Sequence, residues 1–356
     1  MNRDRPRFSI CIPAYNRAKH LPALLDSVFE QDYESFEIVI CEDDSPQRQQ
    51  IRRIASDYSQ SNPKTIRYSE NAQNLGYDAN IRNLVEKAEG DFCFFMGNDD
   101  LMCPGALRHV GGILSRYDNL GIILKSYAWF DSSPEVVNQE VRYFSAERRF
   151  ARGAEAIAVC FRRSGVISGY IIHRDTAYAA ATDRFDGSLY YQLHLTASVL
   201  RERDAVSTPR VLVLCRSSEP PEFGVNRREA EAFVPGRYTP RARLAMIRGA
   251  LSIIRCHEQE SGLPLARTVM RDYANYFYPY IRDQLSLSPP EFLGLYLKFA
   301  AMGFYKYPPN DRTEVVYIQG TAHCADMYPA RDQDLPSLLL AREYIGNLLI
   351  AWLKQD

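Results

Sequence analysis

Two adjacent carboxylates, Asp99 and Asp100, stand with the amide Asn98 just beyond a run of five apolar residues, Phe92–Met96. The run predicts a buried strand, and α/β proteins bind their ligands beyond the carboxyl ends of such strands. Neighbouring carboxylates repel each other, so they are best tolerated in water or on a cation. A divalent ion that holds a substrate diphosphate is one interpretation of this cluster, and a solvated turn is the other.

Two more polar clusters follow predicted strands. Tyr15–Arg17 follows the apolar run Phe8–Ala14, and Glu42–Ser45 follows the run Ser35–Cys41. Strands and helices alternate here at the spacing of βαβ units, which predicts a mostly parallel sheet covered on both faces. All three clusters should then lie at one edge, where an aromatic wall, carboxylates and a metal could bind a nucleotide.

The elements between these clusters carry no glycine-rich phosphate loop. The first strand is not followed by Gly-x-Gly-x-x-Gly, and there is no Gly-Lys-Ser/Thr motif. This argues against a dinucleotide fold and against a P-loop enzyme. The negative charge of a bound phosphate must then be neutralised in another way, and a metal ion at Asp99 and Asp100 would do so. The remaining helices and strands of this part are predicted over residues 19–30, 47–60, 65–69 and 79–88.

Taken together, these motifs resemble glycosyltransferase family 2, whose members have the GT-A fold. The resemblance covers the chain to about residue 130 and rests on four stretches in the family's order, residues 9–17, 36–45, 74–76 and 90–100. It implies an α/β, Rossmann-like domain with a mostly parallel sheet flanked by helices. It also implies that a sugar is transferred, with inversion, from a nucleotide-sugar to an acceptor hydroxyl.

The resemblance implies a role for each residue that matches a family motif. The matched residues line the donor base, supply the acid that contacts it, and lie on the helix after Asn74-Leu75-Gly76. Asp100 is the expected metal ligand, with Asp99 beside it, and the ion is Mg²⁺ or Mn²⁺. The residues expected at the donor nucleotide are Pro13, Ala14, Tyr15, Arg17, Glu42, Asp43, Asp44, Asn80, Arg82, Asn98 and Asp99.

This chain departs from the family's pattern in three places. Asn98 replaces the first Asp of the Asp-x-Asp signature, Asp44 is followed by Ser45 without the usual Gly, and Tyr190-Tyr191 stands near where the family often has Glu-Asp. An inverting transferase needs a general base at the acceptor hydroxyl. We expect Asp186, with Asp183 and His194 as alternatives; a turn role for Asp186 and a core role for His194 are the competing interpretations.

The overall composition is that of a globular protein with no nucleic-acid footprint. The chain is 46% hydrophobic and 24% charged, with a net charge of -1. It shows no signal-peptide core and no apolar run long enough to span a bilayer. The eight cysteines form no Cys-x-x-Cys pair, and the six histidines lack zinc spacing. We therefore expect a cytoplasmic protein, with a place at the inner face of the membrane left open.

The sequence predicts three segments: the GT-A domain over residues 1–216, a linker over 217–240, and a helical extension over 241–356. Apolar stripes predict helices in the extension at 241–258, 265–283, 290–304 and 335–354. Simple core packing explains such stripes most often. Completion of the acceptor site, a homo-oligomer interface and peripheral membrane contact are three further interpretations.

We therefore expect an inverting glycosyltransferase of bacterial surface polysaccharide or related glycan assembly. Its partners would be a nucleotide-sugar donor and a glycan or lipid-linked acceptor. One alternative is a catalytically silent relative that binds nucleotide-sugars as a scaffold. Another is a sugar nucleotidyltransferase, but that class needs a basic glycine-rich loop, which Tyr15–Arg17 does not supply.

Overall fold

The computed structural model of this chain describes residues 6–62, 65–282, 288–306 and 316–319. The chain divides into two compact units. The first is Met1–Val269 with Glu314–Ile318, and the second is Met270–Thr313 with Gln319–Asp356. The segment boundaries that we expect at residues 216 and 240 stay predictions.

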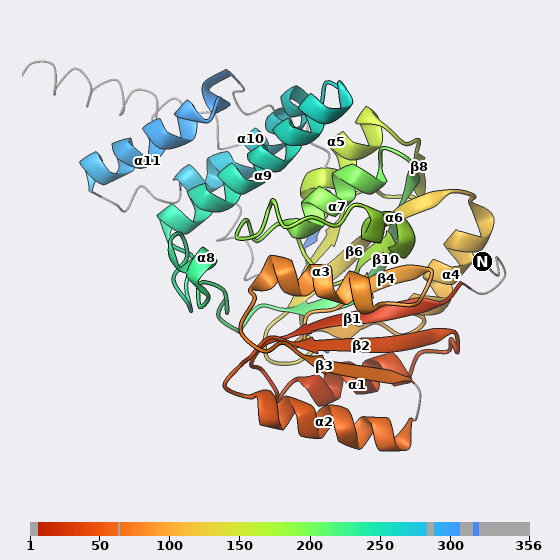
Figure 1. The fold of residues 1–356 in the computed structure, drawn as a ribbon. Helices are drawn as coiled ribbons and strands as arrows, with labels where there is room; N and C mark the ends of the chain where they lie inside the picture. Colours follow the sequence, from red (N-terminus) through yellow and green to blue (C-terminus); the bar gives the residue numbers. More distant parts are fainter. Residues whose placement is uncertain (1–5, 63–64, 283–287, 307–315, 320–356) are drawn as a thin grey trace, which may run out of the picture. The chain divides into compact units, whose positions relative to one another are not determined.

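Half of the sheet in the first unit is parallel. Strand β1 (Phe8–Ala14) pairs with β2 (Phe36–Glu42) and with β4 (Phe92–Phe95), and β2 pairs with β3 (Ile66–Glu70), all in parallel. The central strands are buried almost throughout, since helices cover both faces (Figure 1). The four carboxyl ends therefore lie at one edge of the sheet, which we call the carboxyl edge.

The other half of the sheet is mixed. Strand β9 (Tyr170–His173) lies antiparallel between β4 and β6 (Leu120–Phe130), and β10 (Asp204–Arg216) runs parallel to β6. The start of β9 and the end of β10 therefore reach the carboxyl edge as well. The remaining strands are β5 (Leu101–Met102), β7 (Val137–Arg142), β8 (Arg148–Phe150) and β11 (Val316–Gln319).

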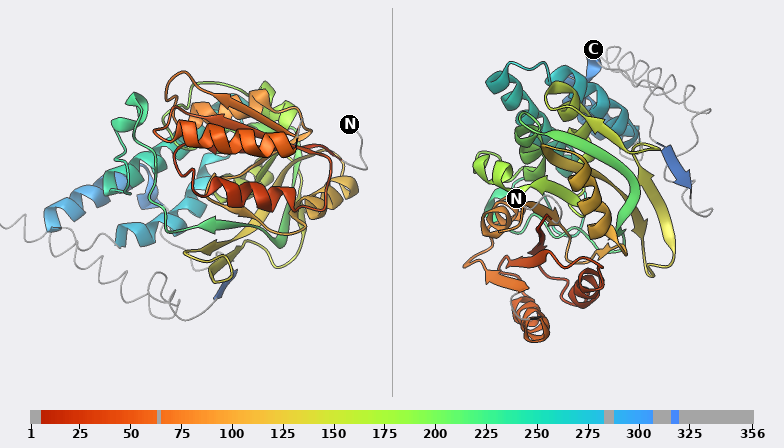
Figure 2. Two further views of the ribbon diagram at one scale, coloured as in Figure 1. Left: turned by 90° about the horizontal axis from the view of Figure 1, so that it is seen from below. Right: turned by 90° about the vertical axis from the view of Figure 1, so that its right-hand side faces the viewer.

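Helices lie on both faces of the parallel half. Figures 1 and 2 show α1 (Leu21–Phe29) and α2 (Arg48–Ser61) on one face and α3 (Tyr77–Lys87) on the other. Helix α1 buries Leu21, Leu24, Leu25 and Val28, one stripe at helical spacing. The predicted α/β class is thus confirmed. The other helices before residue 200 are α4 (Ala106–Arg116), α5 (Ala154–Arg163), α6 (Arg174–Ala179) and α7 (Tyr191–Val199).

Most of the described residues after β10 lie in helices, and β11 is the one strand among them. Helix α9 (Pro240–Ser261) begins with the Thr239 side chain accepting a hydrogen bond from the Ala242 amide, and it ends at Gly262, whose φ is 69°. None of the described helices is both long and apolar enough to span a membrane. The predicted helix 335–354 lies outside the described residues. The remaining helices are α8 (Arg227–Ala230), α10 (Ala266–Arg282), α11 (Pro289–Ala301) and the 3₁₀ turn Phe304–Lys306.

Candidate functional site

The loops after β1 and β4 meet at the carboxyl edge. Asn98 Nδ2 donates a hydrogen bond of 2.8 Å to the Asn16 carbonyl, and Arg17 Nη1 lies 2.8 Å from Asp99 Oδ2. Asn16 and Arg17 have φ values of 53° and 56°. This left-handed pair turns the chain sharply after β1 and brings Arg17 to the acidic cluster. Two of the three predicted clusters are thus in direct contact.

Asp100 is buried, and its carboxylate is held by residues at the ends of two strands, β9 and β10. Ser168, just before β9, donates a hydrogen bond to Oδ2, and the Arg216 amide at the end of β10 donates to Oδ1 over 2.7 Å. Burial, reinforced by the neighbouring Asp99 carboxylate, raises the pKa of Asp100 to about 7. Ser168 Oγ also accepts a 2.7 Å hydrogen bond from the Gly97 amide, which ties this turn to β9.

Ser168 and Arg216 were not among the predicted site residues. Arg216 stands at the carboxyl end of β10, much as the Asp99 cluster stands beyond the apolar run Phe92–Met96. The rule that polar residues after strands build the site would therefore have identified it. Ser168 precedes an antiparallel strand, and that rule considers only residues that follow a strand.

Glu42, in the second predicted cluster, holds the loop between β2 and helix α2. Its buried carboxylate accepts hydrogen bonds from the Ser45 amide at 2.7 Å and the Asp44 amide at 3.1 Å, and from Arg48 Nε at 2.5 Å. Asp44, by contrast, has an exposed side chain and a φ of 55°. It is the one carboxylate of this cluster that faces solvent, although Arg48 Nη1 lies 3.1 Å from it.

Asp43 fastens the loop before α3. Its carboxylate accepts hydrogen bonds of 2.9 Å from the amides of Leu75 and Gly76, and of 2.8 Å from Asn71 Nδ2. Burial raises the pKa of Asp43. Asn80 belongs to the same network, because its amide donates to the Cys41 carbonyl over 3.1 Å. Asp43 and Asn80 therefore fix the wall of the candidate nucleotide site.

The first predicted cluster forms a half-buried aromatic surface beside these acids. Ala14 is buried at the end of β1, while Pro13 and Tyr15 keep part of their surface open. Burial, together with the nearby carboxylate of Glu222, raises the pKa of Tyr15. An aromatic ring with free surface next to the exposed Asp44 is an arrangement that can accept a nucleobase.

Residues 217–229, which we call the cover segment, extend over the loop after β1. Glu219 lies 2.8 Å from both Lys19 Nζ and His20 Nε2, and Glu222 accepts a 3.2 Å hydrogen bond from Asn16 Nδ2. The Pro220 carbonyl accepts a 2.5 Å hydrogen bond from Arg17 Nη2. This part of the chain, expected as a linker, therefore contacts residues of the candidate site directly.

Asp186, the first candidate for the general base, lies in an ion-paired network. Arg82 donates to its two oxygens at 2.5 and 3.0 Å, and Arg228 donates at 2.7 Å. Arg82 also donates to the Thr182 carbonyl over 2.9 Å and lies 5.6 Å from the centre of the Tyr191 ring. The Arg82 side chain thus binds to the segment before α7. In the described part of the chain, neither residue contacts Asp99 or Asp100.

The two alternative bases are also apart from the acidic cluster. Asp183 is exposed. His194 has both ring nitrogens engaged, with Nδ1 at 3.0 Å from His257 Nε2 and Nε2 at 2.8 Å from the Ala180 carbonyl. Burial lowers the pKa of His194. The structure thus joins the loops after β1 and β4, but among the described residues neither Arg82 nor any of the three base candidates has a hydrogen bond or ion pair with Asp99 or Asp100.

The fit of a divalent ion depends on Asp99 and Asp100. Among the described residues, no group of three or more His, Cys, Asp and Glu side chains could hold a metal by itself. Mg²⁺ needs only one or two protein carboxylates when phosphates and water supply its other ligands. The pair therefore fits an ion that arrives with a diphosphate rather than a resident structural metal.

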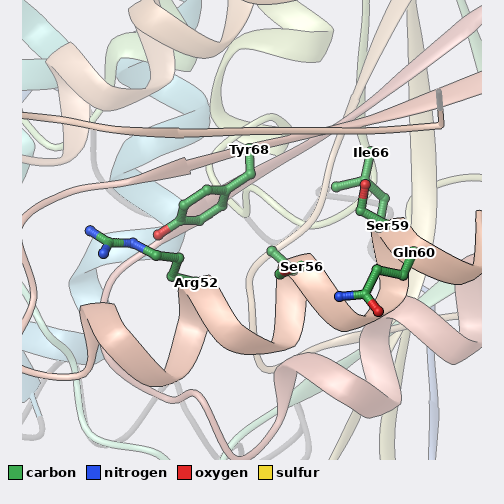
Figure 3. A pocket seen from close by; sticks show the side chains of 7 residues that line it. Arg52, Ser56, Ser59, Gln60, Ile66 and Tyr68 are labelled. Atoms are coloured by element: carbon green, nitrogen blue, oxygen red, sulfur yellow. The ribbon is translucent and has the colours of Figure 1, made fainter. Parts of the chain in front are cut away.

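A separate hollow of about 390 Å³ lies between α2 and the outer strand β3. Figure 3 shows Arg52, Ser56 and Gln60 on the helix and Tyr68 on the strand around it. None of the predicted site residues lines this hollow.

Comparison with known proteins identifies the domain that carries the site. A family model described as glycosyl transferase family 2 matches residues 9–171. Abequosyltransferase RfbV of Salmonella typhimurium is 33% identical over 99 residues, which cover 28% of this chain and 30% of the relative. Poly(ribitol-phosphate) beta-N-acetylglucosaminyltransferase TarS of Staphylococcus aureus is 28% identical over 122 residues, which cover 33% of this chain and 21% of the relative.

Among solved structures, this chain is similar to S. aureus TarS in complex with UDP-GlcNAc, with a TM-score of 0.49. Their sequences are 17% identical, and the likeness covers 84% of this chain and 78% of the other. The chain spans less than half of the length of either curated relative.

Proposed function

This chain belongs to glycosyl transferase family 2 through residues 9–171, and we propose that it transfers a sugar from a nucleotide-diphosphate sugar to an acceptor hydroxyl with inversion. The observation that carries the proposal is the meeting of the loops after β1 and β4 through Arg17 and Asp99, within the matched domain. A donor bound at the carboxyl edge would find an aromatic surface, an exposed carboxylate and an acidic pair.

In the proposed complex, the donor base lies against Pro13 and Tyr15, which flank the buried Ala14, with Asp44 as its hydrogen-bond acceptor. Asp43 and Asn80 act indirectly, because their polar atoms hold the surrounding loop. Asp99 and Asp100 would hold Mg²⁺ or Mn²⁺ on the diphosphate. The ion would stabilise negative charge on the leaving group.

Ser168 and the Arg216 amide are proposed to keep the Asp100 carboxylate turned toward the donor. They hold one oxygen each, so the side chain cannot rotate freely. Fixing a charged group before the substrate arrives avoids its reorganisation during the reaction. These residues thus act through Asp100 and are positioning residues.

The proposed general base is Asp186, a carboxylate that pairs with Arg82 and Arg228. It would have to exchange at least one of these partners for the acceptor hydroxyl. Asp183 and His194 stay the alternatives.

The acceptor is proposed to be a growing surface polysaccharide or a lipid-linked glycan, met at the cytoplasmic face of the membrane. The support is that RfbV and TarS carry glycosyltransferase names, one of them with poly(ribitol-phosphate) as its named acceptor. The screen described next identifies the donor sugar.

A screen of purified protein against nucleotide-sugars, with and without Mn²⁺, tests this proposal. The account predicts slow, metal-dependent release of one nucleoside diphosphate, and its loss in Asp100→Asn. The exposed Asp57, on α2, provides a matched control as Asp57→Asn. Tight metal-dependent binding without release, whichever acceptor is added, would favour the alternative of a catalytically silent relative. The pairing of Asp186 with two arginines also supports that alternative.

A further inference from the structure

A strongly basic stretch begins within the cover segment. Residues 225–257 contain seven arginines and two glutamates, with no lysine and no aspartate, in a chain of net charge -1. One of the two glutamates, Glu229, is buried and accepts hydrogen bonds from the Tyr77 and Gly224 amides at 2.9 and 2.8 Å. Arg228 pairs with Asp186, and the stretch still carries more arginines than glutamates.

Several of these arginines are exposed and unengaged. Arg227, Arg237, Arg241 and Arg248 are exposed, and within the described ranges they form no hydrogen bond or ion pair through their side chains. Arg241 and Arg248 are seven residues apart on α9, close to two helical turns, so they project from the same side of the helix. Guanidinium groups left without partners in this way are available to an anionic ligand.

Exposed apolar side chains accompany these arginines. Val225, Val234 and Tyr238 are 47%, 40% and 45% exposed, half of the six large exposed hydrophobic side chains among the residues that the structure describes. The Gly224 backbone packs against Phe233, so Val225 and Val234 come from adjoining stretches. A backbone bridge pairs Val234 with Arg237.

An aromatic cluster packs within this surface. Phe223 packs against Phe233 and Tyr238 with ring centres 5.5 and 5.3 Å apart, and Arg243 lies 3.7 Å from the centre of the Tyr238 ring. Phe233 also belongs to a small core with Met246 of α9. The exposed valines and arginines are thus presented by a packed structure.

The surface adjoins the candidate donor site. Glu229 of α8 holds the first residue of α3, and Glu222 reaches the loop after β1. Figure 1 shows α8 beside the end of the sheet that carries these loops.

We propose that this α8–α9 surface, formed by Val225, Arg227, Val234, Arg237, Tyr238 and Arg241, binds an anionic lipid membrane. Exposed cations interspersed with valine and tyrosine are suited to the boundary between headgroups and acyl chains. A soluble polyanion would pair with the arginines but leave the apolar side chains in water. If the proposed function holds, such docking would bring the carboxyl edge to acceptors carried by lipids.

Vesicle sedimentation with the full chain tests the proposal, and it requires no catalytic activity. We expect binding to vesicles of phosphatidylcholine with phosphatidylglycerol, weak binding to phosphatidylcholine alone, and weakening at high salt. Arg237→Glu/Arg241→Glu should bind the anionic vesicles at least about 25-fold more weakly, since each removed arginine accounts for roughly fivefold. Arg53→Glu/Arg152→Glu, exposed elsewhere and equal in charge change, should bind like the wild type.

A second pair of variants separates a membrane from a polyanion. Val225→Ser/Val234→Ser keeps every charge, and we expect it to weaken vesicle binding while leaving heparin binding unchanged. Equal loss in the two arginine pairs, or heparin binding without vesicle binding, would overturn the proposal. Unchanged thermal unfolding of all variants would show that they fold, and the nucleotide-sugar screen tests the proposed function separately.

Discussion

Arg17 Nη1 lies 2.8 Å from Asp99 Oδ2, and this ion pair joins loops that are 82 residues apart in the sequence. The side chains are 18% and 7% exposed. The pair holds the aromatic loop and the acidic cluster in one site, and its cation offsets part of the charge that Asp99 and Asp100 bring together.

Replacement of Arg17 tests whether its ion pair with Asp99 stabilises the folded protein. Arg17→Met should lower the free energy of unfolding by about 1–3 kcal/mol, because it leaves a largely buried carboxylate unpaired at a site that still has some access to water. Urea unfolding measures the change. Arg53→Met, on the exposed side of α2, is the control and should stay within about 0.5 kcal/mol of the wild type. Equal stability of the two variants would contradict the prediction.

Asp100→Asn should separate stability from activity. The pKa of Asp100 is raised from 3.8 to about 7, because burial disfavours its ionised form. Above pH 7 the ionised side chain destabilises the folded state, and below pH 4, where the side chain is protonated, this cost is absent. Without divalent ions, the variant should therefore be more stable than the wild type at pH 8, by about 1–4 kcal/mol. The advantage should shrink as the pH falls toward 4.

Thermal unfolding in chelator across this pH range checks that prediction. Asp57→Asn serves as the control, since an exposed carboxylate on α2 should show no such pH-dependent difference. A stability of Asp100→Asn below that of the wild type at every pH would mean that the charged carboxylate is favourable where it stands.

Asp186→Asn distinguishes a base from a structural ion pair. If Asp186 is the base, turnover should fall roughly 10²- to 10⁴-fold while donor binding is kept. If its role is to hold Arg82 and Arg228, the main effect should be a loss of stability of about 1–3 kcal/mol. Steady-state kinetics beside chemical unfolding gives both quantities. Arg228→Gln controls for the loss of one ion pair without loss of the carboxylate.

The buried histidines between α7 and α9 predict a pH-dependent loss of stability. Burial, with the nearby His194, lowers the pKa of His257 to about 4 from the usual 6.5. The neutral form is favoured in the folded state, so its contribution is complete above pH 6.5 and is lost as the pH falls toward 4. The slope from this group is at most about 1.4 kcal/mol per pH unit.

The measurement is the pH dependence of unfolding for the wild type and His257→Gln. Comparing the two removes the opposite contributions of Asp78 and Asp100, whose pKa values are raised. We expect a shallower dependence between pH 6.5 and 4 in the variant. Parallel curves would show that His257 does not carry the effect. The charged neighbours that act on this pair are Glu260, Arg184 and Arg201.

The sequence predicted the parallel half of the sheet closely because its strands are continuous apolar runs. The run Phe8–Ala14 coincides with β1, and Tyr15, Asp44 and Asp99 follow strands as expected. Helix α3 begins at Tyr77, two residues before its predicted start, because Glu229, far along the chain, accepts a hydrogen bond from the Tyr77 amide. A local pattern does not contain that contact.

The same limit applies to the cover segment. Its two prolines and one glycine are typical of a linker, and only the tertiary pairing of Glu219 with Lys19 and His20 shows where it lies. Likewise, Asp186 has the residue type of a base, but its partners Arg82 and Arg228 come from two distant helices. Spacing and periodicity do not show which distant residues pair, so they do not predict where such side chains lie.

The most direct test of the central claim is calorimetric titration of the protein with the donor that the screen identifies, with and without Mn²⁺. The account predicts metal-dependent binding by the wild type and by Asp57→Asn, and at least about tenfold weaker binding by Asp100→Asn, since the carboxylate supplies a ligand to the ion. Equal, metal-independent binding by all three proteins would place the donor elsewhere and contradict the assignment of the carboxyl edge as the donor site.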